Sequence, residues 1–265
     1  MRLTIVGSTG SMSGPVGAAS CYLVQADGVD PDTGEERTWS LIMDLGPGAF
    51  GQLWKFLTPR DLDAVLISHG HADHMADIIS LQVYLKWHPE GEIRGLPVYG
   101  PEETPTRIVQ VEGYRTNFDE YGAFDFRPVQ HGTQFEVGPM KVSAFHGLHT
   151  VESYGFRIEG PSDRGDDEVV TIAYTGDTDS CDAMEEMARN VDLLLAECGF
   201  TDGVEVRGIH LSGTRAAELA QGAGAKSLVL THIQPWTDTD IPLTEAESVL
   251  GVRPEIAKVG GTWSL

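Results

Sequence analysis

A run of ligand-type side chains, placed directly after an apolar strand, constrains this chain more than any other feature of its sequence. Residues 64–68 (AVLIS) have the aliphatic and β-branched character of a buried strand. They lead into the hexapeptide HGHADH at 69–74, and residues 74–86 continue with the apolar period of a helix. Four imidazole or carboxylate side chains in six residues are hard to explain by chance, so the sequence predicts a metal site at a strand-to-helix turn.

The spacing within the hexapeptide predicts two neighbouring ions. Residues two apart in an extended segment point to the same side, so His69 and His71 can reach one ion together. Asp73 and His74 lie beyond the bend, where the helix begins, and can face a second ion. The mixture of imidazole and carboxylate suits Zn²⁺ or a similar divalent metal.

The remainder of the chain predicts strands covered by helices. We expect further strands at residues 3–7, 21–25, 39–45, 96–99, 124–129, 141–145, 154–158, 169–174, 191–198 and 226–233. We expect further helices at 181–189, after a capping Ser212, and from a capping box at 244–247, with an exposed hairpin tip at 27–37 and a polar linker at 161–168. Two blocks of strands, each with covering helices, favour an α/β fold of two sheets packed face to face between helical layers.

Charge and cysteine content limit the partners and the compartment. The formal net charge of −22 repels nucleic acid and anionic lipid over most of the surface, which excludes a general nucleic-acid coat protein. The three cysteines, Cys21, Cys181 and Cys198, form no C-x-x-C pair and indicate a reducing compartment. The first apolar run is too short for a signal peptide, and no stretch approaches a membrane span, so we expect a cytoplasmic protein without membrane contact.

The HGHADH segment resembles the H-x-H-x-D-H signature of the metallo-β-lactamase superfamily. Further motifs of that family are matched in chain order by Asp44 in MDLGPG, His149 in HTVESYGFRIEG, Asp177 in YTGDTD and His232 in LVLTHIQPW. The resemblance implies a four-layer αββα sandwich, formed as one domain over residues 1–265, with a dinuclear metal site at its edge.

The resemblance also implies the roles of these residues. His69, His71 and His149 hold one ion; Asp73, His74 and His232 hold the other; Asp177 bridges the two, and Asp44 supports the site by bonding a ligand. Zn²⁺ is the favoured metal at both positions and Mn²⁺ the alternative.

Other histidines compete for these roles. His146 lies three residues before His149, but His149 directly precedes VESYGFRI, as the family's ligand precedes its strand. We therefore interpret His146 as a structural residue or as a neighbour that supports the ligands. His88 and His131 have no motif around them and are expected to be surface or turn residues.

Two further residues indicate a branch of the superfamily. Glu197 ends the strand LLLAEC, and His210 opens HLSGT before a helix, which resembles an element of the ribonuclease Z branch. In that branch the glutamate and the histidine form a proton-donating pair. Cleavage of a phosphodiester expels an alkoxide, a poor leaving group until it is protonated, so the pair favours phosphodiester chemistry. We predict that Asp73, His210 and Glu197 act in catalysis, Asp73 being also a metal ligand. The alternative is that His210 neighbours a helix cap and Glu197 is an exposed acid.

The substrate is predicted to be small. Ribonuclease Z enzymes that process tRNA carry a long basic arm before the bridging aspartate, whereas His149 and Asp177 are only 28 positions apart here, with the acidic tip PSDRGDDE between them. The run from YTGDTD through HLSG to LTHIQPW resembles small bacterial cyclic-nucleotide phosphodiesterases. We therefore predict a phosphodiesterase for small anionic phosphodiesters, with 3′,5′-cyclic nucleotides such as cyclic AMP as the leading substrate.

Three rival functions stay open at this point. One is a tRNA 3′-endonuclease, which the missing arm disfavours. Another is a lactone, thioester or β-lactam hydrolase, which the pair of Glu197 and His210 disfavours. The third is a metal-binding scaffold without activity. Family likeness alone indicates a homodimer.

Weaker signals surround the main motifs. The glycine-rich segment 7–14 lacks the G-K-[ST] of a phosphate-binding loop, so we expect a tight turn near the site. Trp87 and Trp236 follow metal-motif segments and could stack on a base, but we interpret both as packing residues.

Overall fold

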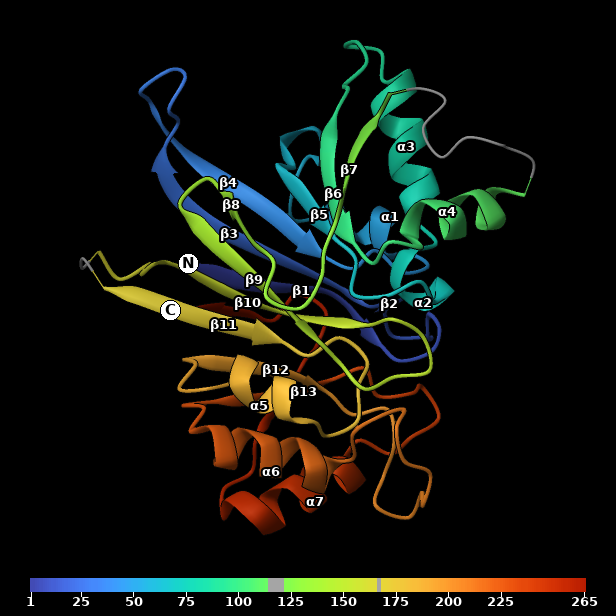
Figure 1. Ribbon diagram of the computed structural model, residues 1–265, viewed down its shortest axis with the longest axis vertical. Helices are drawn as coiled ribbons and strands as arrows, with labels where there is room; N and C mark the ends of the chain where they lie inside the picture. Colours follow the sequence, from blue (N-terminus) through green and yellow to red (C-terminus); the bar gives the residue numbers. More distant parts are fainter. Residues whose placement is uncertain (114–121, 166–167) are drawn as a thin grey trace.

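The computed structural model describes residues 1–113, 122–165 and 168–265, and its strands form two sheets (Figure 1). The first sheet has the order β15 (Thr262–Ser264), β1 (Arg2–Thr9), β3 (Cys21–Val29), β4 (Glu36–Met43), β5 (Ala64–Leu66), β6 (Leu96–Gly100), β7 (Phe124–Pro128), with β2 (Ala18–Ala19) beside β1. The second has the order β14 (Glu255–Ile256), β13 (Leu228–Thr231), β12 (Leu193–Glu197), β11 (Val169–Tyr174), β10 (Tyr154–Pro161), β9 (Met140–His146), β8 (Gln134–Val137).

Helices cover the outer face of each sheet. The first sheet is covered by α1 (Ala49–Leu53), α2 (Ala72–Met75), α3 (Ile78–Trp87) and α4 (Thr104–Glu112), and a short 3-10 helix lies at Pro59–Asp61. The second sheet is covered by α5 (Asp182–Met187), α6 (Gly213–Ala223) and α7 (Asp240–Leu250). Helix, sheet, sheet and helix therefore follow one another across the molecule, which confirms the predicted four-layer αββα fold (Figure 1).

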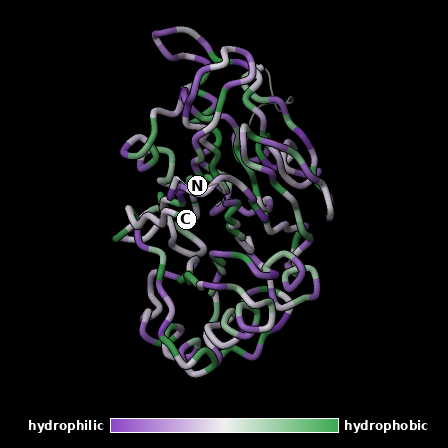
Figure 2. Tube along the Cα trace, turned by 90° about the vertical axis from the view of Figure 1, so that its left-hand side faces the viewer, coloured by the Kyte–Doolittle hydropathy of each residue, from purple (hydrophilic) through white to green (hydrophobic). Residues whose placement is uncertain are grey.

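Alternate residues of each strand face opposite sides of its sheet, and both sides are covered. Tyr22 and Val24 of β3 face the core between the sheets, whereas Leu23 faces the helices outside the first sheet. In β12, Leu195 faces the central core and Leu194 faces α5 to α7. Because both faces are covered, these strands are continuously apolar, and the hydrophobic segments lie mainly inside the molecule (Figure 2).

Several element boundaries differ from the prediction. The hairpin of β3 and β4 stays paired as far as Val29 opposite Glu36, so the tip predicted at 27–37 shrinks to residues 30–35. The helix predicted at 74–86 is divided into α2 and α3. The loop predicted at 7–14 begins only at Gly10, because residues 7–9 belong to β1.

Capping was predicted correctly for one helix and wrongly for another. Ser212 caps α6, where its side chain accepts a hydrogen bond from the Arg215 amide. The last helix instead begins at Asp240, one turn before the predicted capping box, and the Thr244 hydroxyl donates to the Asp240 carbonyl. The linker predicted at 161–168 includes residues 166–167, which lie outside the described residues.

The topology brings the site residues to one edge. Strands β4 and β5 are parallel in the first sheet, as are β11, β12 and β13 in the second. The carboxyl ends of parallel strands meet at a common edge, which is where α/β sheets bind ligands. In the described ranges, no helix is long and apolar enough to cross a membrane.

Candidate metal centre

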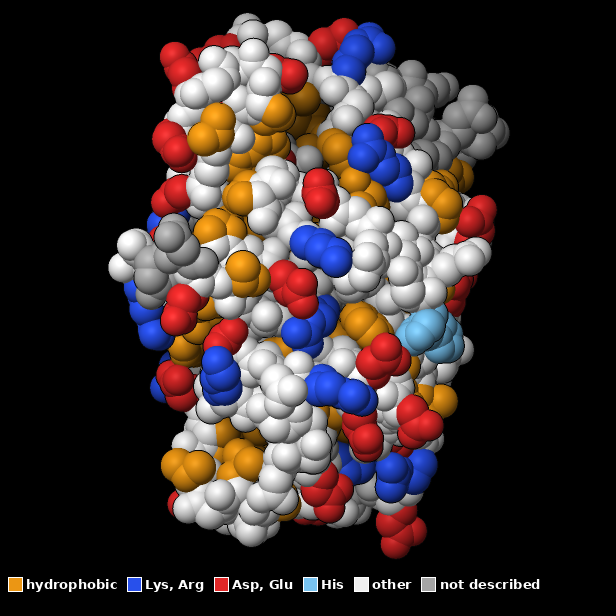
Figure 3. Space-filling model, turned by 60° about the vertical axis from the view of Figure 1, so that its left-hand side comes forward, with side chains coloured by type: hydrophobic (Ala, Val, Ile, Leu, Met, Phe, Trp, Pro, Cys, Tyr) orange, Lys and Arg blue, Asp and Glu red, His pale blue; other side chains and the backbone are white. Residues whose placement is uncertain are grey.

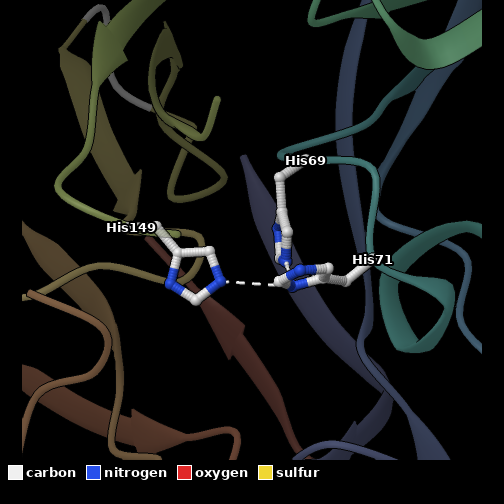
Figure 4. A group of neighbouring side chains, drawn as sticks. All are labelled: His69, His71 and His149. Carbon is white, nitrogen blue, oxygen red and sulfur yellow. Dashed lines mark hydrogen bonds between the residues drawn. The ribbon is translucent and has the colours of Figure 1, made fainter. Parts of the chain in front are cut away.

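Three histidines from the two halves of the chain form the first group. His69 and His71 follow β5, and His149 lies in the segment between β9 and β10 (Figure 4). The Nδ1 atom of His71 is 3.0 Å from Nε2 of His69 and 3.2 Å from Nε2 of His149. Burial lowers the pKa of all three imidazoles below the usual value, so their ring nitrogens are free of the extra proton at neutral pH.

The spacing of these nitrogens fits a shared ion. Two ligand nitrogens at about 2.05 Å from a tetrahedral Zn²⁺ stand about 3.3 Å apart, close to the separations in this group. His149 is oriented for this purpose, because its Nδ1 bonds the Ile209 carbonyl oxygen at 2.7 Å and leaves Nε2 toward the other rings.

Two histidines and two aspartates form the second group. The Nε2 atoms of His74 and His232 are 3.1 Å apart, and Oδ2 of Asp73 lies 3.4 Å and 3.2 Å from them, respectively. Oδ1 of Asp177 lies 3.3 Å from Nε2 of His74 and 3.5 Å from Nε2 of His232. These atoms surround one point with separations that suit the ligand shell of a divalent ion.

Asp177 faces both groups. While its Oδ1 belongs to the second group, its Oδ2 lies 3.8 Å from Nε2 of His69 in the first. Oδ1 is buried and has no hydrogen-bond partner among the described residues. A buried carboxylate oxygen without a donor is costly unless a cation binds it, so the donor set fits two ions with Asp177 between them.

Asp44 orients His74 from behind. Its Oδ2 accepts hydrogen bonds from Nδ1 of His74 at 2.7 Å, from the Tyr174 hydroxyl at 2.8 Å and from the Ser68 hydroxyl at 2.9 Å. Its Oδ1 accepts the Ser68 amide at 2.7 Å. A carboxylate that accepts the far ring nitrogen fixes the tautomer and the direction of a metal-binding imidazole. The expected supporting contact of Asp44 is therefore present.

Two residues of the site adopt left-handed backbone. Asp44 has φ 63° and His232 has φ 57°, and such conformations cost about 1–3 kcal/mol in residues other than glycine. At His232 the chain is held by Gly10, where an added Cβ would lie 2.2 Å from the His232 carbonyl oxygen. The Ser11 amide donates to Nε2 of His232, so the loop after β1 does lie at the site, as predicted.

Glu197 and His210 lie beside both groups. Nδ1 of His210 is 2.9 Å from Oε1 of Glu197, a fully buried residue. Oε1 also accepts the Thr178 amide, and Oε2 accepts the Gly199 amide. Burial lowers the pKa of His210, but the Glu197 carboxylate outweighs it and raises the pKa to about 9. Glu197 is therefore not the exposed acid of the alternative interpretation.

The backbone at Gly199 packs closely against the His210 ring. Gly199 passes so near the imidazole that an added Cβ would lie 2.7 Å from Cγ of His210. The His210 ring centroid lies 5.3 Å from that of His149 and 5.5 Å from that of His232. The side chain thus stands at the boundary of the two groups, with a protonated ring at neutral pH.

The competing residues lie elsewhere. His146 is exposed, and its ring meets Tyr154 edge-on rather than the ligand groups. His131 is exposed and accepts the His146 amide, so it is the turn residue that we expected. The interpretation of Trp87 and Trp236 as packing residues is wrong, because 66% and 68% of their surfaces are exposed.

Sequence reasoning overlooked Asp179. This carboxylate is 1% exposed and binds two arginines, Arg207 and Arg215. A signal was available, since a second acid follows Asp177 by two positions in YTGDTD. The arginine partners lie 28 and 36 residues further along the chain, and no local pattern joins them to it.

The family of the chain is shown by a family model that matches most of it. The family model described as a beta-lactamase superfamily domain matches residues 39–233, which include every proposed metal ligand. The chain belongs to the metallo-β-lactamase superfamily. The αββα sandwich described above is the fold of this superfamily.

Relatives of the chain resemble it along most of its length. ML1173 of Mycobacterium leprae is 35% identical over 251 residues, covering 94% of this chain and 83% of its own. The probable metallo-hydrolase YhfI of Bacillus subtilis is 29% identical and covers 99% of both chains. The crystal structure of YhfI superposes with a TM-score of 0.81 at 28% identity, over 100% of this chain and 99% of its own.

A ribonuclease Z is also similar. The enzyme from Methanopyrus kandleri is 26% identical over 243 residues, which cover 80% of this chain and 83% of the enzyme. Together with YhfI, this superfamily membership makes the chain a metal-dependent hydrolase.

Proposed function

We propose that the chain is a dinuclear phosphodiesterase that hydrolyses small phosphodiesters in the cytoplasm, with 3′,5′-cyclic nucleotides as the leading substrate. The observation that carries the proposal is the pair of Glu197 and His210 next to the two ligand groups. Hydrolysis of a lactone or a β-lactam makes less demand for a proton donor than expulsion of an alkoxide does. The pair therefore favours a phosphodiester over those substrates.

The proposal assigns metal-binding roles to seven residues and proton donation to a further pair. His69, His71 and His149 would hold one divalent ion, Asp73, His74 and His232 the other, and Asp177 both. When bound, the ions, Zn²⁺ or alternatively Mn²⁺, supply a nucleophilic water at neutral pH and neutralise charge on the phosphoryl group. His210 holds a proton on its imidazole, and Glu197 keeps it there until the leaving oxygen takes it.

The size of the substrate is argued from the segment between His149 and Asp177. Strands β10 and β11 occupy about half of this interval and pair from Phe156 opposite Tyr174 to Pro161 opposite Val169. An interval of 28 positions is too short for the long arm that holds a tRNA. Acidic and basic side chains are interspersed on the face shown in Figure 3, and the net charge of −22 opposes a long polyanion.

A panel of four substrates tests the proposal. We expect cyclic AMP and bis-p-nitrophenyl phosphate to be cleaved readily, with a modest dependence on salt, and precursor tRNA and a lactone slowly or not at all. The likeness to ribonuclease Z makes a tRNA 3′-endonuclease the second candidate. Efficient cleavage of precursor tRNA at one position would reverse this ranking, and preference for the lactone would exclude phosphodiester chemistry. Homodimer formation stays a prediction that light scattering can measure.

Trp236 is the exposed aromatic residue that we expect to contact a nucleobase. Its neighbour Pro235 packs against the loop after β1, where Gly14 would place a Cβ 3.0 Å from the proline side chain, and that loop donates to His232. Stacking on an aromatic ring is worth about 1–3 kcal/mol for each base. Trp236→Ala should therefore raise KM for cyclic AMP about 5- to 100-fold while leaving KM for bis-p-nitrophenyl phosphate nearly unchanged.

Trp87 provides the matched control for this prediction. It is exposed to the same degree as Trp236 but ends α3, at the end of the helix away from the HGHADH turn. Trp87→Ala should leave both KM values unchanged. Equal effects of the two substitutions on cyclic AMP would contradict a specific contact at Trp236.

A further inference from the structure

The segment between β12 and α6, residues 198–212, carries two groups that the site needs. We call it the His210 loop. Its Ile209 carbonyl oxygen accepts Nδ1 of His149 at 2.7 Å, and the next residue is the proton donor itself. A movement of this short stretch would turn a proposed metal ligand and displace the acid at the same time.

One buried carboxylate fastens this stretch. Asp179 follows β11 by five residues and accepts, each at 2.7 Å, the Arg207 Nε, the Gly208 amide and the Arg215 guanidinium. Arg207 and Gly208 lie directly before Ile209, whereas Arg215 belongs to α6. Asp179 thus joins the His210 loop to the segment that carries Asp177 and to the helix that follows.

The charge of Asp179 makes this junction strong. The carboxylate is 1% exposed and forms ion pairs with Arg207 and Arg215, each at 2.7 Å. Hydrogen bonds to an ionised carboxylate are roughly twice as strong as neutral ones. A second fastening lies further back, where Glu245 of α7 accepts the amides of Asp202 and Gly213.

We propose that Asp179 is the positioning residue that sets His149 and His210 relative to Asp177. This inference rests on the proposed function, because it assigns those three residues their roles. Asp179 contacts neither ligand group in its own right, and it acts through Gly208 and Arg207 on the residues that follow them. The bonds of Glu245 reach Asp202 and Gly213, outside residues 207–210. Within 207–210, Glu197 bonds the ring of His210, and Asp179 bonds Arg207 and Gly208, the two residues directly before Ile209.

Three measurements on Asp179→Ala and Asp179→Asn test the proposal. We expect faster amide hydrogen exchange at residues 207–210. In chelator competition, the affinity for one of two zinc ions should fall about 10- to 100-fold, as is typical when a residue that supports a metal ligand is lost. Cleavage of cyclic AMP should fall by a similar factor and that of bis-p-nitrophenyl phosphate by less, since a displaced acid matters least for a good leaving group. The asparagine keeps one acceptor oxygen and should lose less in each measurement.

Asp63→Asn is the matched control. Asp63 also accepts an arginine, Arg37, and a backbone amide, that of Ser40, but it lies before β5, at the opposite end of that strand from the HGHADH turn. We expect this substitution to leave exchange at 207–210 and zinc affinity unchanged. Arg207→Ala removes only the exposed arginine that Asp179 binds, and the protein should stay folded. It should change exchange and zinc affinity in the same direction as the Asp179 substitutions, but only several-fold.

The outcomes separate this inference from the proposed function. Exchange and zinc affinity require no turnover, so a change in both would support the positioning role even if no phosphodiester were cleaved. Unchanged exchange and zinc affinity in folded Asp179 and Arg207 variants would overturn it, whatever the wild-type substrate. A loss of zinc affinity equal to that of Asp63→Asn would show a general effect of a lost carboxylate and would also overturn it.

Discussion

Substitution of Asp177 by alanine should abolish the proposed phosphodiester hydrolysis and lower the metal content below the expected two ions in each chain. Oδ1 of Asp177 faces His74 and His232 and Oδ2 faces His69, so the substitution removes a donor from both groups at once. Loss of a residue that merely supports a ligand costs about 10- to 100-fold, and the loss of a shared ligand should exceed this. Metal analysis and turnover of bis-p-nitrophenyl phosphate measure the two effects.

Two control substitutions separate the loss of a metal ligand from the loss of side-chain volume or of a carboxylate elsewhere. Asp177→Asn has the same volume and should also lose activity, because it lacks the charge and one of the two carboxylate oxygens. Asp192→Asn changes a carboxylate that accepts the Thr171 amide and Lys226 far from the ligand groups, and it should retain activity and metal. Full activity of the wild-type chain after removal of metal by a chelator would contradict the mechanism.

The two-sheet fold was predictable because its buried strands appear in the sequence as short apolar runs. Strands such as β5 and β12 are short, apolar and bounded by polar or turn residues, and their order follows the chain. Element ends were less predictable, since tertiary contacts decide them. The helix after HGHADH is interrupted at Asp77, whose carboxylate accepts the Phe50 amide of α1, and no local pattern announces that bond.

The ligand groups were predictable for a different reason. His69, His71, Asp73 and His74 lie within one hexapeptide, and His149, Asp177 and His232 lie in motifs that resemble those of the superfamily. The supporting bonds, in contrast, join residues far apart in the chain. Tyr174 donates to Asp44 across 130 positions, and Arg215 reaches Asp179 across 36. The first pair forms only when the two sheets pack together, and the second only when α6 packs against the second sheet.

Replacement of His210, the proposed proton donor, should slow turnover without loss of metal. His210→Ala leaves all seven proposed ligands in place, so about two ions should remain in each chain. Turnover of cyclic AMP should fall about 10²- to 10⁴-fold, the usual contribution of a general acid. Cleavage of bis-p-nitrophenyl phosphate should fall much less, because p-nitrophenolate departs with little protonation. Equal losses on both substrates would mean that His210 positions the substrate, and loss of an ion would mean that it is a ligand.

The pH profile gives an independent test of the same pair. Burial lowers the pKa of His210 and Glu197 raises it to about 9. An acid works only while it is protonated, so its contribution is present below its pKa and is lost as the pH rises through that value. Glu197→Gln removes the charge that raises the pKa, and the basic limb of kcat should therefore move to lower pH. The substitution should reproduce the leaving-group dependence of His210→Ala more weakly. An unmoved basic limb in a folded, metal-loaded Glu197→Gln variant would show that the carboxylate does not tune the donor.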